Sequence, residues 1–519
     1  TLPLNARGWY AIRFGIWYPS DFGGPHRGVL RVKLTGDPYF SHIAGEEYRP
    51  EKDGRYPEKD IPTDAITEVF WKCADVKEKQ LIITRPPIGT LSSIPTNIAY
   101  VRLTPIDEKD ITDWQSEQPT PATKTMIGYE TGFFEREYAM SREVFREKFA
   151  HFRDTDFDIV LYRAASGGTT LYPSQVGQFV LPNTTWSEHL YNCVSWGLDP
   201  LREAVEAAHE CGVKLFAQNR LHGAHLPPHH DRMEHGGSFM ADHPEFLCRF
   251  ADGEPIRHLS LAFKEVRDFH IRLLREWVEV YKVDGICIPF NRSWPFVLYE
   301  PPVCEAFQES YGEDMRALPE GEPRVRKIRS CFITRFLQEI REMLDEVGEA
   351  QGRHIPTCYP IPVEDPVHGN ESAFEVPLNH GLDVATWIQN GLVDYLLLHL
   401  EIHREHDGTE AQDVIRPFAD LTRDTDTSLV VDIYPRRMPS RQYRSIAQRY
   451  YEAGADRISL FDTHYRYKRA SEWSFACRLG HRDNLERWAG KGDDYLQSVP
   501  LRRLDGFVMG RSYSDMTDG

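Results

Sequence analysis

Beyond about residue 125 the sequence alternates short apolar runs with amphipathic segments, and this alternation restricts the fold more than any other feature. The clearest example lies near the middle of the chain. Apolar side chains recur at three- and four-residue steps from Val266 to Val280, which predicts a helix with one buried face. The run that follows, 283–290, is short and almost continuously apolar, as expected of a parallel strand buried on both faces.

The same pattern predicts eight strands in all. One helix between them has clear ends, with Asp199 as N-cap, Pro200 in the first turn and Gly212 after the last turn. Eight strands that alternate with helices predict a (β/α)8 TIM barrel. A doubly wound open sheet is the alternative, but no GxGxxG or Walker loop follows any strand. The predicted strands are MIGYETGF, DIVLYRAA, VKLFAQNRL, VDGICIPFNR, HIPTCYPI, VDYLLLHLEIH, SLVVDIYP and DRISLFDTHY.

The N-terminal part of the chain has a different pattern. The run GVLRVKL alternates apolar and polar residues with period two, and similar short runs are separated by Gly, Pro, Asp and Lys clusters. This predicts an N-terminal β-sandwich over residues 1–107. The expected divisions after it are a polar linker (108–124), the barrel (125–480) and a C-terminal extension (481–519).

Composition limits the partners. A chain of 519 residues is too long for one ordinary core, and a net charge of -18 argues against a nucleic-acid partner, which needs a basic face. That charge favours a neutral or cationic substrate, and the 12% aromatic content suits a cleft that stacks on sugar rings. No apolar run reaches the ~18 residues of a membrane span. We therefore expect a carbohydrate partner and no membrane. The oligomeric state and the location (cytoplasmic, periplasmic, or secreted after signal removal) stay open.

Ligands of (β/α)8 barrels bind at the carboxyl ends of the strands, so polar side chains there are site candidates. Among them, His399, Glu401 and His403 share one face of the sixth strand because side chains alternate with period two. The candidate catalytic carboxylates are Glu130, Glu401, Asp432 and Asp462. The candidate substrate-binding residues are Arg163, Asn219, Arg220, His222, Asn291, Arg292, Trp294, Tyr359, His399, His403, Tyr434 and His464.

A carboxylate pair at barrel strand ends is what cleavage of a glycosidic bond requires: one acid for the leaving oxygen, and one nucleophile or base. We predict Glu401 as one member because two histidines flank it on the same face, where they can orient it. Asp432 is the predicted partner because the seventh strand lies next to the sixth in a sequentially wound barrel. Asp462 and Glu130 are the reserves. For each carboxylate the alternative is an ion pair with a strand-end arginine.

Two other functions remain open. The segment LHGAHLPPHHD and the pair in HLEIH are rich in histidine, and such clusters can bind a divalent metal. However, no HExxH motif is present, and the first strand ends GYE and not with an HxH pair. We therefore predict neither a metal nor a cofactor and keep a metal-dependent hydrolase as one alternative. The other is an inactive barrel that only binds carbohydrate.

Several stretches together carry a resemblance to a known family. They are DPLREAVEAAHECGVKLFAQNRL, HPEFLCRFADGE, LAFKEVRDFHIRLLREWVEVYKVDGICIPFNR and CEAFQESYGED. With these stretches the chain resembles the family-ten-like glycosyl hydrolases of bacteria over residues 125–465. The resemblance implies a TIM barrel and glycoside hydrolysis. Members often carry an acid where this chain has Pro289, so the resemblance transfers no fourth-strand catalytic acid to this sequence.

Overall fold

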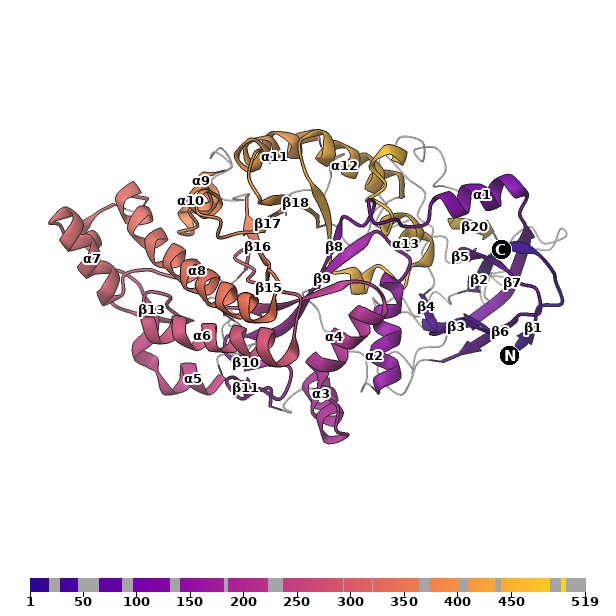
Figure 1. Ribbon diagram of the computed structural model, residues 1–519, viewed down its shortest axis with the longest axis horizontal. Helices are drawn as coiled ribbons and strands as arrows, with labels where there is room; N and C mark the ends of the chain where they lie inside the picture. The colour runs from indigo at the N-terminus through magenta and orange to yellow at the C-terminus, as the bar shows by residue number, and fades with distance from the viewer. Residues whose placement is uncertain are drawn as a thin grey trace, which may run out of the picture.

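In the computed structural model the described residues form a barrel with a smaller β-rich part on one side (Figure 1). In Figure 1 the N-terminal strands, in indigo, lie to the right of the barrel. The described residues are 1–17, 29–44, 65–85, 97–130, 141–181, 185–222, 237–292, 294–319, 321–363, 374–400, 409–434, 440–485 and 496–500.

Eight described strands form a closed parallel barrel, as the alternation predicted. Each strand pairs in parallel with the next, and the ring closes because β8 pairs with both β19 and β9. The carboxyl ends of all eight strands therefore meet at one mouth. The strands are β8 (Met126–Glu130), β9 (Phe157–Ser166), β12 (Lys214–Arg220), β15 (Gly285–Cys287), β16 (Thr357–Pro362), β17 (Tyr395–His399), β18 (Ser428–Ile433) and β19 (Arg457–Phe461).

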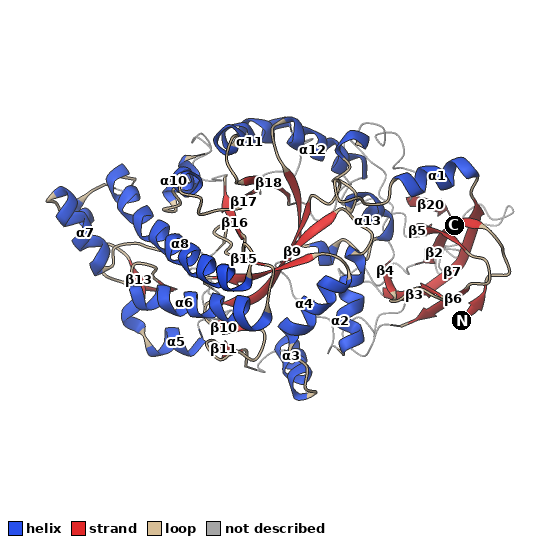
Figure 2. Cartoon of the chain, in the orientation of Figure 1, coloured by secondary structure: helices blue, strands red, loops and turns tan. Residues whose placement is uncertain are grey.

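Helices surround this ring (Figure 2). The main ones are α2 (Arg142–Phe149), α4 (Pro200–Glu210), α6 (Lys264–Glu276), α8 (Pro323–Gln351), α11 (Thr409–Thr422) and α12 (Ser440–Glu452). Shorter helices are α3 (Thr185–Ser195), α5 (Gly237–Asp242), α7 (Pro301–Tyr311), α9 (Glu375–Asn379), α10 (Val384–Gln389) and α13 (Ala470–Ala476). Small strands in the loops are β10 (Thr169–Thr170), β11 (Gln178–Phe179), β13 (Leu247–Arg249) and β14 (Pro255–Leu259). The helices that the structure describes include none with the length and hydrophobicity needed to span a bilayer.

Local signals in the sequence explain the start of α4. The carboxylate of Asp199 accepts hydrogen bonds from the backbone N–H groups of Leu201 and Arg202, which confirms it as the N-cap of α4. The prediction for Val280 is wrong: this side chain is 53% exposed. The chain continues α6 with a π-helical turn over Trp277–Tyr281, and this wider turn rotates the following side chains away from the face that α6 buries.

The barrel strands separate two apolar layers. The smaller layer fills the barrel, and the larger one packs the outer faces of the strands against the helices. Because side chains alternate along a strand, the inward-facing positions identify which strand-end residues point toward the mouth. The inward layer consists of Ile127, Tyr129, Ile159, Leu161, Phe216, Cys287, Cys358, Leu397, Val430 and Phe461.

The β-rich part contains two antiparallel sheets of four described strands each. One has the order β1 (Leu2–Pro3), β6 (Gln80–Thr84), β3 (Val29–Leu34), β4 (Ser41–Ala44). The other has the order β20 (Leu496–Pro500), β5 (Ala65–Asp75), β2 (Trp9–Trp17), β7 (Asn97–Pro105). Side chains of both sheets share one apolar core, with Phe14 and Val69 from one sheet and Val32 and Leu81 from the other.

Two segments differ from the expected divisions. The predicted linker contains helix α1 (Glu108–Ser116), because the Asp107 carboxylate accepts from the N–H of Asp110 and caps it. Trp114 of this helix packs edge-on against Phe70 of β5. In the predicted C-terminal extension, β20 pairs with β5, so residues 496–500 add an edge strand to a sheet of N-terminal strands. The domain boundaries themselves stay predictions.

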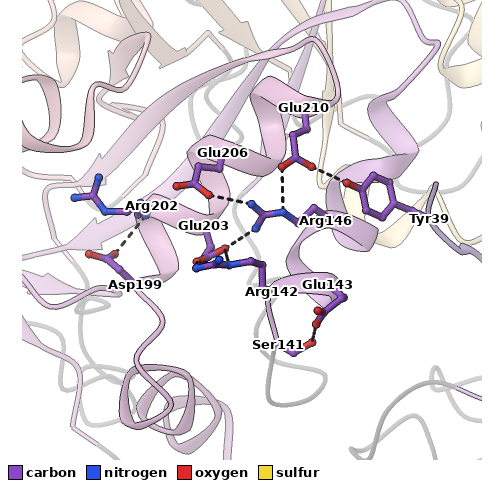
Figure 3. A network of polar contacts seen from close by, with 10 residues as sticks. All are labelled: Tyr39, Ser141, Arg142, Glu143, Arg146, Asp199, Arg202, Glu203, Glu206 and Glu210. Atoms are coloured by element: carbon purple, nitrogen blue, oxygen red, sulfur yellow. Dashed lines mark hydrogen bonds and ion pairs between the residues drawn. The ribbon is translucent and has the colours of Figure 1, made fainter.

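Polar contacts connect the β-rich part to the barrel helices. The hydroxyl of Tyr39 donates to Glu210 of α4 at 2.6 Å, and the guanidinium of Arg31 donates to Glu147 of α2. Figure 3 shows the Tyr39 contact continuing to Arg146 of α2 through Glu210. The sheet that contains β3 and β4 is thus held against α2 and α4.

Candidate active site

A buried carboxylate–histidine pair lies at the barrel mouth. Nδ1 of His399, on β17, lies 2.7 Å from Oδ2 of Asp432, on β18, and both side chains are at most 1% exposed. Leu397 and Val430, two residues earlier on each strand, belong to the inward layer. The pair therefore faces the barrel interior, and Oδ1 of Asp432 has no hydrogen-bond partner among the described residues.

Arg292 fixes the tautomer of His399. Its Nη2 lies 3.4 Å from Nε2 of the histidine. A guanidinium only donates, so Nε2 accepts, and this assigns the ring proton to Nδ1, which donates to Asp432. The Arg292 guanidinium also lies 5.4 Å from the centroid of the Phe461 ring.

Aromatic side chains pack around this pair. The rings of Tyr129 and Tyr434 meet the His399 ring edge-on, with centroids 6.0 Å and 5.1 Å away. The hydroxyl of Tyr129 donates to Oδ1 of Asn291 at 2.9 Å. Contacts thus join Tyr434, His399, Tyr129 and Asn291, which come from four different strand ends.

Glu130 and Asp462 lie beside His464. Nδ1 of His464 is 2.8 Å from Oε2 of Glu130 and 4.0 Å from Oδ1 of Asp462. Burial raises the pKa of the Glu130 carboxyl, and the His464 hydrogen bond opposes part of that rise. Since Ile127 and Tyr129 face the barrel interior, Glu130 leaves β8 on the other face and reaches the turn that holds His464.

The other side of the mouth is basic. Arg163 follows the inward Ile159 and Leu161 with period two, and it is 5% exposed. Gln218 pairs with it in register on β12, and the register then shifts because β9 has one extra residue, Ala164, opposite the step from Gln218 to Asn219. The alternation of β12 itself continues unchanged. Because Asn219 points outward, the next residue, Arg220, faces inward again. Burial and the positive charge of Arg292 lower the pKa of Arg220 to about 10.

Two of the predicted binding residues lie on the helix-facing side of the strands. Nδ2 of Asn219 donates to Nδ1 of His270 on α6 at 3.1 Å. Tyr359 is fully buried against Phe290 and Trp387 of the outer layer. Tyr359 is the third residue of a six-residue strand, and the inward Cys358 precedes it, so alternation turns it toward the helices.

Two more lie in the loops near the mouth. The His222 ring stacks on His258 with centroids 4.3 Å apart, and burial lowers the pKa of His222 well below its usual value. Trp294 stacks on His380, with centroids 4.5 Å apart. The roles of these residues in substrate binding stay predictions.

Glu401 and His403 lie outside the described residues, as do His225, His229 and His230 of the histidine-rich segment. Within the described ranges, no group of three or more His, Cys, Asp and Glu side chains is placed to hold a metal ion. The predicted pairing of Glu401 with Asp432 therefore stays a prediction.

Tyr129 is a mouth residue that was not predicted. It is buried and lies one residue before the end of β8, so a search of only the last residue of that strand passes over it. Alternation counted back from the strand end could have found it. Gln218, a polar residue near the end of the third predicted strand, is also buried, and its Oε1 has no partner among the described residues.

Comparison with protein families identifies the group. The model of the family "Glycosyl hydrolase-like 10" matches residues 134–443, more than half of the chain. The chain belongs to the glycosyl hydrolase-like 10 family. This confirms the resemblance found in the sequence, and the matched region contains six of the eight barrel strands.

Other comparisons concern the fold alone. No curated protein matches the chain. Similar solved structures include α-L-fucosidase isoenzyme 2 from Paenibacillus thiaminolyticus (16% identity, TM-score 0.42, 71% of this chain and 50% of that one). A β-galactosidase from the psychrophilic Marinomonas ef1 has 14% identity and a TM-score of 0.43, with 72% of this chain and 61% of that one covered. The chain thus spans less than two thirds of the length of either protein.

Proposed function

We propose that the protein is a glycoside hydrolase that cleaves O-glycosidic bonds of an oligo- or polysaccharide at the barrel mouth. Membership of a glycosyl hydrolase-like family supports the class of reaction. The observation that carries the proposal is the buried Asp432–His399 pair, because it presents one oriented carboxylate to the interior of the barrel. Asp462 and Glu130 follow on the next two neighbouring strands, β19 and β8.

In the proposed mechanism Asp432 acts on the anomeric centre. Its Oδ2 is held by His399, and its Oδ1 is the atom that attacks the sugar or activates a water. Glu401 is the proposed acid that protonates the leaving oxygen, since it follows β17 two residues after His399. Histidines and aromatic rings at the mouth would bind hydroxyl groups and stack on sugar faces.

Glu130 is the strongest reserve for the acid. Its raised pKa suits a group that must carry a proton near neutral pH. Its position beside His464, on the outward face of β8, argues against direct contact with a sugar held over the barrel. Replacement of Glu130 therefore tests whether Glu130 or Glu401 is the acid.

Hydrolysis of a panel of plant, algal and bacterial glycans by the parent protein and by D432N, E401Q, E130Q and D462N tests this proposal. We expect D432N and E401Q to lose about a thousandfold or more in kcat while the circular dichroism spectrum stays unchanged. The anomer formed first, followed by NMR, separates retention (carboxylates ~5 Å apart) from inversion (~6.5–9.5 Å). Near-parental rates for both variants would refute the pair.

A barrel that binds carbohydrate without cleaving it is the second candidate. It is favoured by Pro289, which is buried next to Phe290 and supplies no acid where family members often carry one. Calorimetric titration of the same glycans separates the two candidates. Binding of a sugar with no product after long incubation would establish the second candidate, and turnover that D432N abolishes would exclude it.

A further inference from the structure

Two amide side chains are buried at the barrel mouth and lack part of their hydrogen bonding. Asn291 is 2% exposed and Gln218 is 1% exposed. Nδ2 of Asn291 and Oε1 of Gln218 have no partner anywhere in the part of the chain that the structure describes. A buried polar atom without a partner is costly, so such an atom at a ligand site marks a place where the ligand supplies the partner.

Asn291 lies close to the proposed catalytic aspartate. Its Oδ1 accepts a hydrogen bond from the hydroxyl of Tyr129 at 2.9 Å, which leaves Nδ2 as a donor for another group. The ring of Tyr129 also meets the ring of His399 edge-on, and His399 in turn holds Asp432. Because one tyrosine contacts both groups, the Asn291 amide and the His399–Asp432 pair border the same part of the mouth.

Gln218 enters this space from the neighbouring strand. Phe216, two residues earlier on β12, belongs to the inward layer, and so does Cys287, the register partner of Gln218 on β15. The Gln218 side chain therefore points into the barrel. Since β12 and β15 are adjacent and Asn291 follows β15, the two amides come from neighbouring strand ends.

A donor and an acceptor on the same side of the mouth favour a free hydroxyl group as the ligand. A sulfate, a carboxylate or an O-methyl ether offers acceptors only and would leave Oε1 of Gln218 without a partner. An ammonium group offers donors only and would leave Nδ2 of Asn291 without one. A hydroxyl group both donates and accepts, so it can pair with either amide.

We propose that Asn291 Nδ2 and Gln218 Oε1 hydrogen-bond free hydroxyl groups of the sugar at the barrel mouth. Both residues then determine specificity: glycans with free hydroxyls at these positions are selected over deoxy, O-methylated and O-sulfated ones. An analogue that lacks the hydroxyl is rejected because the buried amides stay unpaired. This inference rests on the proposed function and narrows its substrate class.

The first test changes the ligand and leaves the protein as it is. Titration calorimetry uses p-nitrophenyl thioglycosides of glucose, galactose, mannose, xylose and N-acetylglucosamine, because a sulfur linkage resists hydrolysis. The glycoside that binds most tightly is then compared with its monodeoxy and mono-O-methyl derivatives. Removal or methylation of the hydroxyl at one or two ring positions should weaken binding about 10- to 100-fold. The same changes at the other positions should alter affinity less than about threefold.

The variants N291L and Q218M test whether these two side chains make the contacts. Each replaces an amide with an apolar group of similar size. Each should bind the intact glycoside about 10- to 100-fold more weakly, yet bind one deoxy derivative within about threefold of the parent protein. A purely structural role would instead weaken binding of every glycoside equally. N192L is the matched control, since Asn192 on α3 is exposed.

Four results would overturn the inference. They are equal affinity for all deoxy derivatives, equal weakening of all glycosides by N291L and Q218M, coupling of both residues to an acetamido group and not to a hydroxyl, and no binding of any of the five glycosides. Turnover of O-glycosides that tolerates the loss of every hydroxyl would count against this inference alone. A hydroxyl requirement in binding without turnover of any glycan would count against the hydrolase proposal alone.

Discussion

Replacing Arg146 with methionine should loosen the contact between α2 and α4. The Arg146 side chain is 10% exposed, and its nitrogens contact the carboxylates of Glu203, Glu206 and Glu210 on α4 (Figure 3). Methionine keeps most of the apolar stem but removes all of these charged contacts. Glu203 is 3% exposed and keeps Arg142, whose nitrogens lie 2.8–3.1 Å away.

The expected cost follows from the burial of each partner. The contact with buried Glu203 contributes about 1.5–3 kcal/mol, as charge-assisted hydrogen bonds do. Glu206 and Glu210 are 49% and 40% exposed, so each pair adds about 0–1 kcal/mol. Because Arg142 still pairs with Glu203, the loss of stability stays below the ~3–5 kcal/mol expected when a buried charge is left without a partner. We expect R146M to lower the free energy of unfolding by about 3 kcal/mol.

Urea denaturation followed by tryptophan fluorescence measures this change, provided that the slope with urea stays the same. A double-mutant cycle with E203Q should give a coupling free energy of about 1.5–3 kcal/mol. R335M is the control and should change stability by about 0.5 kcal/mol or less, as is usual on an exposed surface. A loss below about 1 kcal/mol for R146M, or coupling near zero, would refute this account of the network.

Three further predictions concern buried sites. Burial lowers the pKa of His270 to about 4, so the unfolded state binds more protons between pH ~6.5 and ~4 and stability should fall as pH drops through that range. In urea titrations at several pH values, H270Q should reduce this slope by up to about 1.4 kcal/mol per pH unit; equal slopes would contradict the assignment. G285A should cost about 1–3 kcal/mol in the same assay, because its new methyl group would lie 2.7 Å from the backbone oxygen of Pro356 and 2.8 Å from the Phe216 ring; no loss of stability would contradict this steric clash. E276A removes the carboxylate that accepts hydrogen bonds from Tyr172, Ser174 and Gln175, and it should speed hydrogen exchange over residues 172–177. Unchanged protection would show that this loop stays ordered without Glu276.

The sequence alone determined the barrel and the positions of most of its elements. Strands buried on both faces and helices with one buried face leave local patterns, and each predicted run overlaps one barrel strand. Asp199 was likewise identifiable as an N-cap, because capping depends on residues two and three positions away. The site prediction was local in the same sense: it named polar residues at strand ends.

Which of those residues meet was decided only by the tertiary structure. A strand has two faces, and one extra or missing residue exchanges them. Opposite the step from Gln218 to Asn219, β9 has one extra residue, Ala164, and the pairing of β9 with β12 sets this bulge. Arg163 precedes the bulge and follows the inward period, whereas Ala164 and Ala165 both belong to the outer apolar layer. Pairing with β5 likewise brings β20 to the N-terminal sheet. These features depend on hydrogen bonds between segments far apart in the chain, so local sequence patterns do not predict them. Helix and strand periods arise from near neighbours and can therefore be predicted from the sequence.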